Sequence, residues 1–324
     1  MKVLILSEHD VEALLPMEQC ISVMERALSA LARGEVHQPL RHAVRAPGAS
    51  GLLGLMPVYR GGERPLYGLK EVCVFPDNPA RGLDTHLGAV LLHSGQTGEL
   101  LAIINAAAIT AIRTAAVSAV ATKLLARPES RVLAVIGAGA QARTNIEAIT
   151  RVRDIREIRI CSRTRAKAEA LASGYEEATV HDTVEDAVRG ADVIVTATSS
   201  REPILRGEWI APGTHINAVG SSIAAARELD SAAVAAAALF VDRRESTVNE
   251  SGDYLFALRE GAISGPEHIR AELGELLLGR AEGRRSAEEI TLFKSLGLGI
   301  EDLAAGEHVF DRATAEGRGV WVDF

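Results

Sequence analysis

The chain has 324 residues, of which 47% are hydrophobic and 4% aromatic, and this length suggests about two domains. The formal net charge is -8 and no block of like charge occurs, which disfavours nucleic acid or an anionic membrane surface as a partner. Three cysteines without CxxC spacing, and an N-terminal apolar run too short for a signal peptide, lead us to expect a soluble cytoplasmic protein.

The first third of the chain reads as a short strand, two helices and then a sheet. The strand is expected over Lys2–Leu6. Ser7 and Asp10 have the pattern of a capping box that opens the first helix, and the second helix is expected from Pro16 to Ala32. Between residues 38 and 104, turn-forming dipeptides separate apolar runs, a pattern typical of antiparallel strands. These runs are Leu52–Tyr59, Gly68–Phe75, Ala89–His93 and Leu100–Ile104. An alanine-rich helix is expected next, over residues 107–126.

From Arg131 onward, strands alternate with helices. This alternation predicts a parallel, doubly wound sheet, so the expected class is α/β. The segment Ala287–Ala305 is expected to be helical around a loop at SLGLG.

A glycine turn follows the first strand of this half. The run from Gly137 to Ala142 reads GAGAQA and fits the G-x-G-x-x-G/A form, in which the glycines allow a tight turn and close approach to a pyrophosphate. An apolar strand precedes the turn and an amphipathic helix follows it, which favours a dinucleotide site over a simple connection.

The second strand, Glu157–Cys161, ends in a segment that bears on the choice of dinucleotide. An acidic residue at this place would bind the ribose 2′-hydroxyl of NAD(H). The chain instead has Ser162, Arg163, Thr164 and Lys167, which suit a 2′-phosphate, so NADP(H) is favoured and NAD(H) remains possible.

Three cations lie in apolar surroundings outside the alternating half. They are Arg41, Lys70 and Arg113. Each could simply extend to water, but together they suggest a recess for a small anionic substrate, because guanidinium groups match carboxylates. No Cys, His and Asp cluster has the spacing of a metal site, so no metal is expected.

Over nearly its whole length the chain resembles the ornithine cyclodeaminase/mu-crystallin family. The resemblance rests on GLMPVY, GLKEV, ITAIRTAAVSAVATKLLA, VIGAGAQA and FKSLGLGIEDLAA. It implies a Rossmann unit at residues 119–297, inserted into an α+β substrate and dimerisation domain made of residues 1–118 and 298–324. It also implies a homodimer.

The resemblance assigns roles residue by residue. Arg41, Lys70 and Arg113 would bind the substrate carboxylate and handle the proton. Thr114, Gly139, Ala140 and Gln141 would contact the phosphates, beside the turn glycine Gly137. Ser162, Arg163, Thr164 and Lys167 would surround the adenosine ribose, and Ala197, Thr198, Val219, Ser295, Leu296 and Gly297 would lie near the other ribose and the nicotinamide.

One position departs from the cyclodeaminases of this family. Ser222 stands where they have an aspartate that handles the substrate amine. The resemblance therefore favours an NAD(P)H-dependent reductase of a small 2-imino acid, equivalently an amino-acid dehydrogenase. A cyclodeaminase that releases ammonia with bound NAD, and a protein that binds a small ligand in an NADP(H)-dependent way, remain the alternatives.

Overall fold

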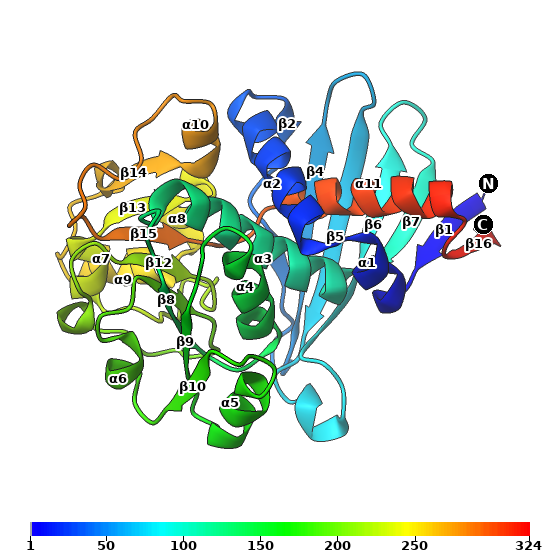
Figure 1. Ribbon diagram of the computed structural model, residues 1–324. Coiled ribbons are helices and arrows are strands. Elements are labelled where there is room, and N and C mark those ends of the chain that lie inside the picture. The colour runs from blue at the N-terminus through cyan, green and yellow to red at the C-terminus, as the bar shows by residue number, and fades with distance from the viewer. Residues whose placement is uncertain (1) are drawn as a thin grey trace. The chain divides into compact units, whose positions relative to one another are not determined.

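The computed structural model describes residues 2–324, and the chain divides into two compact units. The split unit consists of Met1–Arg113 with Leu298–Phe324, and the inserted unit consists of Thr114–Gly297. Figure 1 gives the order of the elements along the chain. The two units are described separately below.

The split unit is built on a mixed sheet whose strands run in the order β16-β1-β7-β6-β5-β4-β2, with β3 paired to β4. The strands are β1 (Lys2–Leu6), β2 (Val36–His37), β3 (His42–Val44), β4 (Leu52–Arg60), β5 (Leu66–Val74), β6 (His86–Ser94), β7 (Leu100–Asn105) and β16 (Val320–Asp323). Strands β4 to β7 pair antiparallel, as their turn-separated apolar runs predict, whereas β1 joins β7 in parallel.

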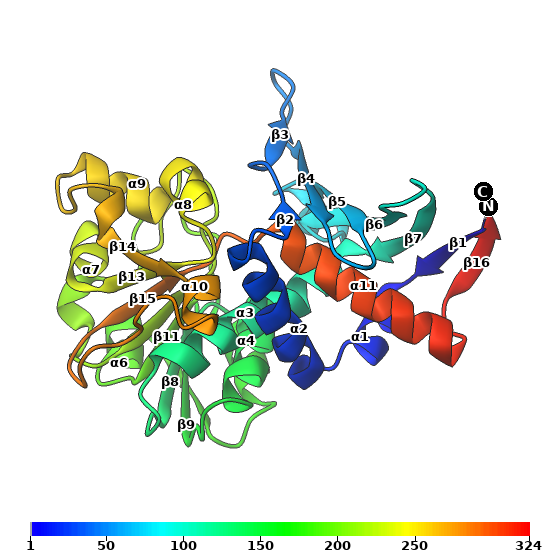
Figure 2. The same ribbon diagram turned by 90° about the horizontal axis from the view of Figure 1, so that it is seen from above.

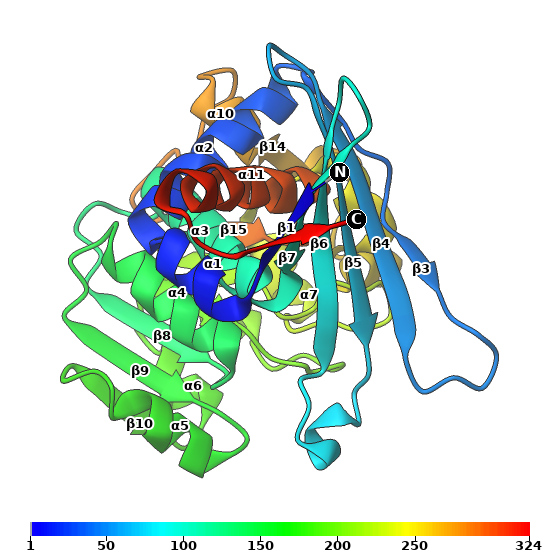
Figure 3. The ribbon, with the colours of Figure 1, turned by 90° about the vertical axis from the view of Figure 1, so that its right-hand side faces the viewer.

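Three helices pack on one side of this sheet, as Figure 3 shows. They are α1 (Glu8–Leu14), α2 (Met17–Ala32) and α11 (Gly299–Glu316), and the short 3-10 helix η1 (Asn78–Arg81) lies between β5 and β6. The predicted box at the start of α1 is present: the Ser7 hydroxyl accepts from the Asp10 backbone N–H, and the Asp10 carboxylate accepts from the Ser7 backbone N–H. Helix α11 packs against β4, β5 and β6.

Helix α3 (Ala106–Leu125) carries the chain from one unit to the other, since the boundary falls after Arg113. By length and composition alone it is apolar enough to span a membrane, but 72% of its apolar window is buried within the protein. A helix that is apolar on all sides and buried is typical of a protein core.

The inserted unit is built on a fully parallel sheet with the strand order β10-β9-β8-β11-β12-β15-β13-β14. The strands are β8 (Val132–Ile136), β9 (Glu157–Cys161), β10 (Ala178–His181), β11 (Val193–Thr196), β12 (His215–Ala218), β13 (Ala238–Val241), β14 (Ile269–Glu272) and β15 (Thr291–Lys294). The chain moves outward in one direction from β8 to β10 and then in the other from β11, which confirms the predicted doubly wound α/β class.

Helices cover both faces of this sheet (Figure 2). They are α4 (Ala140–Thr150), α5 (Arg165–Ala172), α6 (Val184–Val188), α7 (Ser231–Ala236), α8 (Arg244–Glu250), α9 (Gly252–Arg259) and α10 (Leu273–Leu277), with short 3-10 helices η2 (Gly207–Trp209) and η3 (Pro266–His268). Residues of α4 and α5 share one apolar core with the strands, and residues of α6, α7 and α9 share the other. Burial on both faces explains why the strands read as continuous apolar runs.

The prediction of helix over Ala287–Ala305 is wrong for its first part. Thr291–Lys294 forms β15, fully buried between β12 and β13, and helix begins only at Gly299. A buried strand of four residues has no period of its own, so neighbouring strands that are distant in sequence decide its structure.

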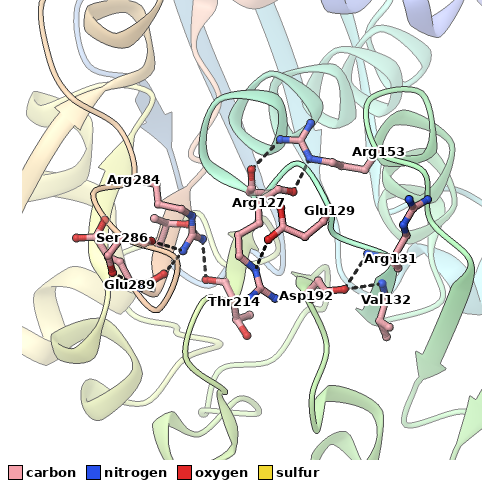
Figure 4. A network of polar contacts seen from close by, with 12 residues as sticks. Arg127, Glu129, Arg131, Val132, Arg153, Asp192, Thr214, Arg284, Ser286 and Glu289 are labelled. Carbon is pink, nitrogen blue, oxygen red and sulfur yellow. Dashed lines mark hydrogen bonds and ion pairs between the residues drawn. The ribbon is translucent and has the colours of Figure 1, made fainter.

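An arginine network closes the amino-terminal edge of the parallel sheet (Figure 4). Asp192 accepts from the backbone N–H groups of Arg131 and Val132 at 2.8 and 3.0 Å and pairs with Arg127 at 2.6 Å. Arg153 donates to the carbonyl oxygens of Thr122 and Ala126, both at 2.8 Å, near the end of α3. The bond to Ala126 satisfies a carbonyl group near the helix end, whereas the Thr122 carbonyl also accepts from the Ala126 backbone N–H at 3.0 Å.

Candidate active site

A buried ionic cluster lies in the split unit where β5, α3 and α11 supply charged side chains. The Lys70 side chain is 5% exposed and that of Arg113 is 4% exposed, which is rare for such residues unless they are paired. Arg113 Nη1 lies 2.5 Å from a Glu301 carboxylate oxygen, and its Nε lies 2.9 Å from Asp302 Oδ1. Lys70 Nζ lies 3.2 Å from the other oxygen of Asp302.

The start of α11 explains why two acids are placed here. Gly297 turns the chain with a φ of +80°, and Glu301 and Asp302 then fall in the first turn of the helix, where the helix dipole favours negative charge. The buried amide oxygen of Gln38 accepts from the Ile300 backbone N–H at 3.0 Å, which satisfies one of the free donors of this helix end.

Burial dominates the electrostatics of Lys70. The pKa of this ammonium falls from 10.5 to about 8: burial lowers it most, Arg113 and Arg41 also lower it, and Asp302 opposes the shift. Arg41, which is half-buried, therefore lies close enough to act on Lys70. The structure thus brings together all three cations that the sequence singled out.

Sequence reasoning missed Glu301 and Asp302. Both are almost completely buried, and Asp302 binds the two cations Lys70 and Arg113 through one carboxylate. A signal was present in GIEDLAA, because two adjacent acids inside an apolar run are costly to bury unless they meet cations. The sequence did not indicate which cations these two acids would pair with in the folded protein.

In the inserted unit, the glycine turn has the form that a dinucleotide requires. Gly137 has a φ of +127°, and a Cβ there would lie 2.4 Å from the Ala197 carbonyl oxygen. Gly139 precedes α4, and a Cβ on it would meet nothing within 4 Å, so there is room for a phosphate beside the start of this helix. This turn fits the pyrophosphate of a dinucleotide.

At the end of β9 the structure leaves two cations available. Arg165 binds Glu169 at 2.8 Å and also pairs with Asp182, whereas Arg163 and Lys167 are exposed and form no ion pair within residues 2–324. Ser162 Oγ accepts from the Thr164 backbone N–H at 3.4 Å. The segment is therefore polar and cationic, without a carboxylate in its first turn of helix.

The other predicted cofactor residues lie at neighbouring strand ends of the same unit. Ala197 and Thr198 follow β11, Val219 follows β12, and Ser295–Gly297 follow β15. Asp242, after β13, accepts from the Leu296 and Gly297 backbone N–H groups at 2.6 and 2.7 Å. Ligands of open parallel sheets bind outside these carboxyl ends. Thr114 is the first residue of the unit and is buried within α3.

The chain is similar to known proteins over nearly its whole length. The model of the ornithine cyclodeaminase/mu-crystallin family matches residues 1–317. The ketimine reductase mu-crystallin of Mus musculus is 43% identical over 295 residues, which cover 90% of this chain and 91% of the mouse protein.

Two solved structures superpose on almost the whole chain. The first is the Δ1-pyrroline-2-carboxylate reductase of Thermococcus litoralis in complex with NADH and L-proline, with a TM-score of 0.93, 38% identity, and coverage of 98% of this chain and 99% of that one. The second is an archaeal alanine dehydrogenase dimer with bound NAD, with a TM-score of 0.94, 36% identity and full coverage of both chains, 100% each.

Proposed function

The chain belongs to the ornithine cyclodeaminase/mu-crystallin family, and we propose that it is an NAD(P)H-dependent reductase of a small 2-imino acid, acting on a C=N bond beside a carboxylate. The observation that carries this proposal is the buried cluster in which Asp302 holds both Lys70 and Arg113. In the reverse direction the same chemistry is that of an amino-acid dehydrogenase.

The chemistry of the substrate follows from these side chains. Arg113 and Arg41 bind the carboxylate of the imino acid, because guanidinium groups donate in pairs to carboxylates. Reduction adds a hydride to the imine carbon and a proton to the nitrogen. Lys70, with a pKa of about 8, is largely protonated at neutral pH and can still release its proton, which suits a proton donor. Asp302 fixes the direction in which both cations point.

We assign the cofactor to the inserted unit. When bound, a nicotinamide dinucleotide supplies the hydride. Gly137, Gly139, Ala140 and Gln141 would hold its pyrophosphate, with Thr114 beside them. We favour NADP(H), because Arg163 and Lys167 are free to bind a 2′-phosphate. The Thermococcus and archaeal relatives were solved with NADH and NAD, so both nucleotides belong in the test.

We also propose a cytoplasmic homodimer whose split units associate. The archaeal relative was solved as a dimer, and the edge strand β16 exposes Trp321 by 48% while Phe324, which follows it, is exposed by 73%. The cysteines Cys20, Cys73 and Cys161 are all free, in keeping with a reducing compartment.

The first experiment follows absorbance at 340 nm with NADPH or NADH and a panel of cyclic imines and of 2-keto acids with ammonia. Oxidation of either nucleotide is expected, with turnover lost in Lys70→Met while the nucleotide still binds. A Lys70→Met variant that turns over like the wild type would remove Lys70 from the mechanism.

Two other functions make different predictions. A cyclodeaminase would release ammonia from ornithine or lysine without a net change at 340 nm, and Ser222 in place of an aspartate argues against it. A ligand-binding protein would bind a small acid tightly together with the dinucleotide and oxidise no nucleotide with any substrate of the panel.

A further inference from the structure

A second buried ionic cluster lies in the inserted unit at the carboxyl ends of its strands. It consists of Glu228, Asp253 and Lys294, which are 0%, 3% and 1% exposed. Lys294 ends β15, Asp253 lies in the first turn of α9, and Glu228 lies between β12 and α7. The proposed chemistry uses none of these three residues.

Glu228 joins two strand ends through four donors. One carboxylate oxygen accepts from the Thr198 backbone N–H and the Thr198 hydroxyl, both at 2.7 Å. The other accepts from the Thr196 hydroxyl at 2.8 Å and the Gly220 backbone N–H at 2.7 Å. Thr196 and Thr198 belong to the end of β11 and Gly220 follows β12, so one carboxylate ties the loops after both strands.

The fit around this carboxylate is tight. A Cβ on Gly220 would lie 2.2 Å from the Thr198 carbonyl oxygen and 2.4 Å from Glu228 Oε1, so the loop after β12 approaches closely only because residue 220 is glycine. Burial raises the pKa of Glu228, while Lys294 and the bonds from Thr198 lower it. Four donors directed at two oxygens are a site built for an ionised carboxylate.

Asp253 and Lys294 hold Glu228 in place. Asp253 Oδ1 accepts from the Glu228 and Leu229 backbone N–H groups at 2.8 and 2.9 Å. Its other oxygen lies 2.9 Å from Lys294 Nζ. Lys294 thereby connects the end of β15 to the segment that carries Glu228, and its charge also opposes the burial of Glu228.

The opposite edge of the same sheet shows that an acid can fix strand ends without being completely buried, and therefore with a smaller desolvation penalty. There Asp192 bonds two backbone N–H groups and pairs with Arg127, but its side chain is 18% exposed and that of Arg127 is 28% exposed (Figure 4). Burying three charges completely carries a large desolvation penalty, and replacing buried ion pairs by apolar residues is often stabilising. Stability alone therefore explains the carboxyl-edge cluster poorly.

The strand order identifies what lies beside this cluster. The connections reverse direction between β8 and β11, and a dinucleotide bound to such a sheet crosses at that point. Its adenosine half then lies toward β9, and its nicotinamide half lies toward β11 and β12. The four donors to the Glu228 carboxylate lie at the ends of β11 and β12.

We infer that Glu228 is a positioning residue for the nicotinamide half of the dinucleotide, held in place by Asp253 and Lys294. It fixes the loops that begin at Ala197 and Val219 so that their backbone surrounds the nicotinamide and its ribose. The inference rests on the proposed function, because it needs a nicotinamide dinucleotide in the inserted unit.

The test compares two probes by calorimetric titration, in the wild type and in Glu228→Gln. One probe is the whole nucleotide, NADPH, and the other is its adenosine fragment, 2′,5′-ADP. NADH and its fragment ADP are compared in the same way as a second pair. In Glu228→Gln an amide N–H₂ replaces one oxygen and faces two donors. We expect the Kd of NADPH to rise at least tenfold, a loss of about 1.4 kcal/mol, while the Kd of 2′,5′-ADP stays within twofold.

Asp192→Asn is the matched control, because it weakens an acid that holds strand ends on the other edge. It should lower the melting temperature and leave the ratio of the two dissociation constants unchanged. Should Glu228→Gln fail to fold, Thr196→Val removes one of the four donors without changing side-chain shape and should still raise the ratio.

The outcomes distinguish failure of the proposed function from failure of the role assigned to Glu228. A wild-type protein that binds neither member of either pair contradicts the proposed function. A wild type that binds both, with variants whose ratio of dissociation constants equals that of the wild type, overturns the role of Glu228 and leaves the proposed function intact. Equal weakening of both probes in Glu228→Gln would also overturn it, because that is the effect of general loosening.

Discussion

The protonation of Lys70 should control the pH dependence of imine reduction. Because burial lowers its pKa to about 8, the ammonium form that can donate a proton is lost at a lower pH than for an exposed lysine. At pH 7 about nine tenths of the free enzyme carries the proton, and at pH 9 about one tenth does. kcat/KM for reduction should therefore fall about tenfold between pH 7 and pH 9.

The two kinetic constants should respond differently. kcat/KM reports the pKa of the free enzyme, whereas kcat reports that of the substrate complex. A bound carboxylate beside Lys70 favours the charged ammonium, so the decline in kcat should lie at higher pH than the decline in kcat/KM. Initial rates at 340 nm over pH 6.5–10, at low and at saturating imine, measure both.

Two variants test whether the decline of kcat/KM at high pH is due to Lys70. Lys70→Arg keeps a positive charge at every pH in the range and should give a slower enzyme with a flat profile. Asp302→Asn removes the carboxylate that raises the pKa of Lys70, so its decline should move to lower pH. A decline that is unchanged in Lys70→Arg would refute the reasoning and would belong to the substrate or to another group.

Two further predictions concern stability. His215 is fully buried, with its pKa lowered from 6.5 to about 3 by burial, so the unfolded chain binds its proton first and stability falls as the pH drops below 6.5. Urea unfolding should show about 2 kcal/mol lost from this group between pH 7 and pH 5, and His215→Gln should have a flatter profile, or the assignment is wrong. Arg153→Leu should lower the free energy of unfolding by roughly 2 kcal/mol, because the Ala126 carbonyl loses the guanidinium donor and the Thr122 carbonyl loses its second donor, and turnover per folded molecule should be unchanged. A variant as stable as the wild type would show that water replaces the guanidinium.

The fold was largely predictable because its signals are local. Alternating strands and helices, and antiparallel runs between turn dipeptides, each follow from residues close in sequence. The errors concern short elements that tertiary pairing decides. β15 was predicted as helix, and β10, β14 and β16 were not predicted at all, since a strand of four residues carries no distinct pattern.

The candidate site was predictable only in part for the same reason. A cation inside an apolar run is visible in the sequence, and Lys70 and Arg113 were found in this way. Their partner Asp302 lies 232 residues from Lys70 and 189 from Arg113, so no spacing rule could connect them. Glu228 was equally hidden, because its four donors come from the ends of two separate strands.

The two places where the chain passes between units carry charged site residues. At the first crossing, Arg113 of the split unit is followed directly by Thr114 of the inserted unit. At the second, Ser295–Gly297 lead within a few residues to Glu301 and Asp302. Both crossings therefore covalently join a segment proposed to bind the cofactor with one that carries residues of the buried ionic cluster. Arg113 of this cluster belongs to α3, and Glu301 and Asp302 belong to α11, so the chain connects the cluster to the inserted unit through two segments, whereas an end-to-end fusion would have a single linker.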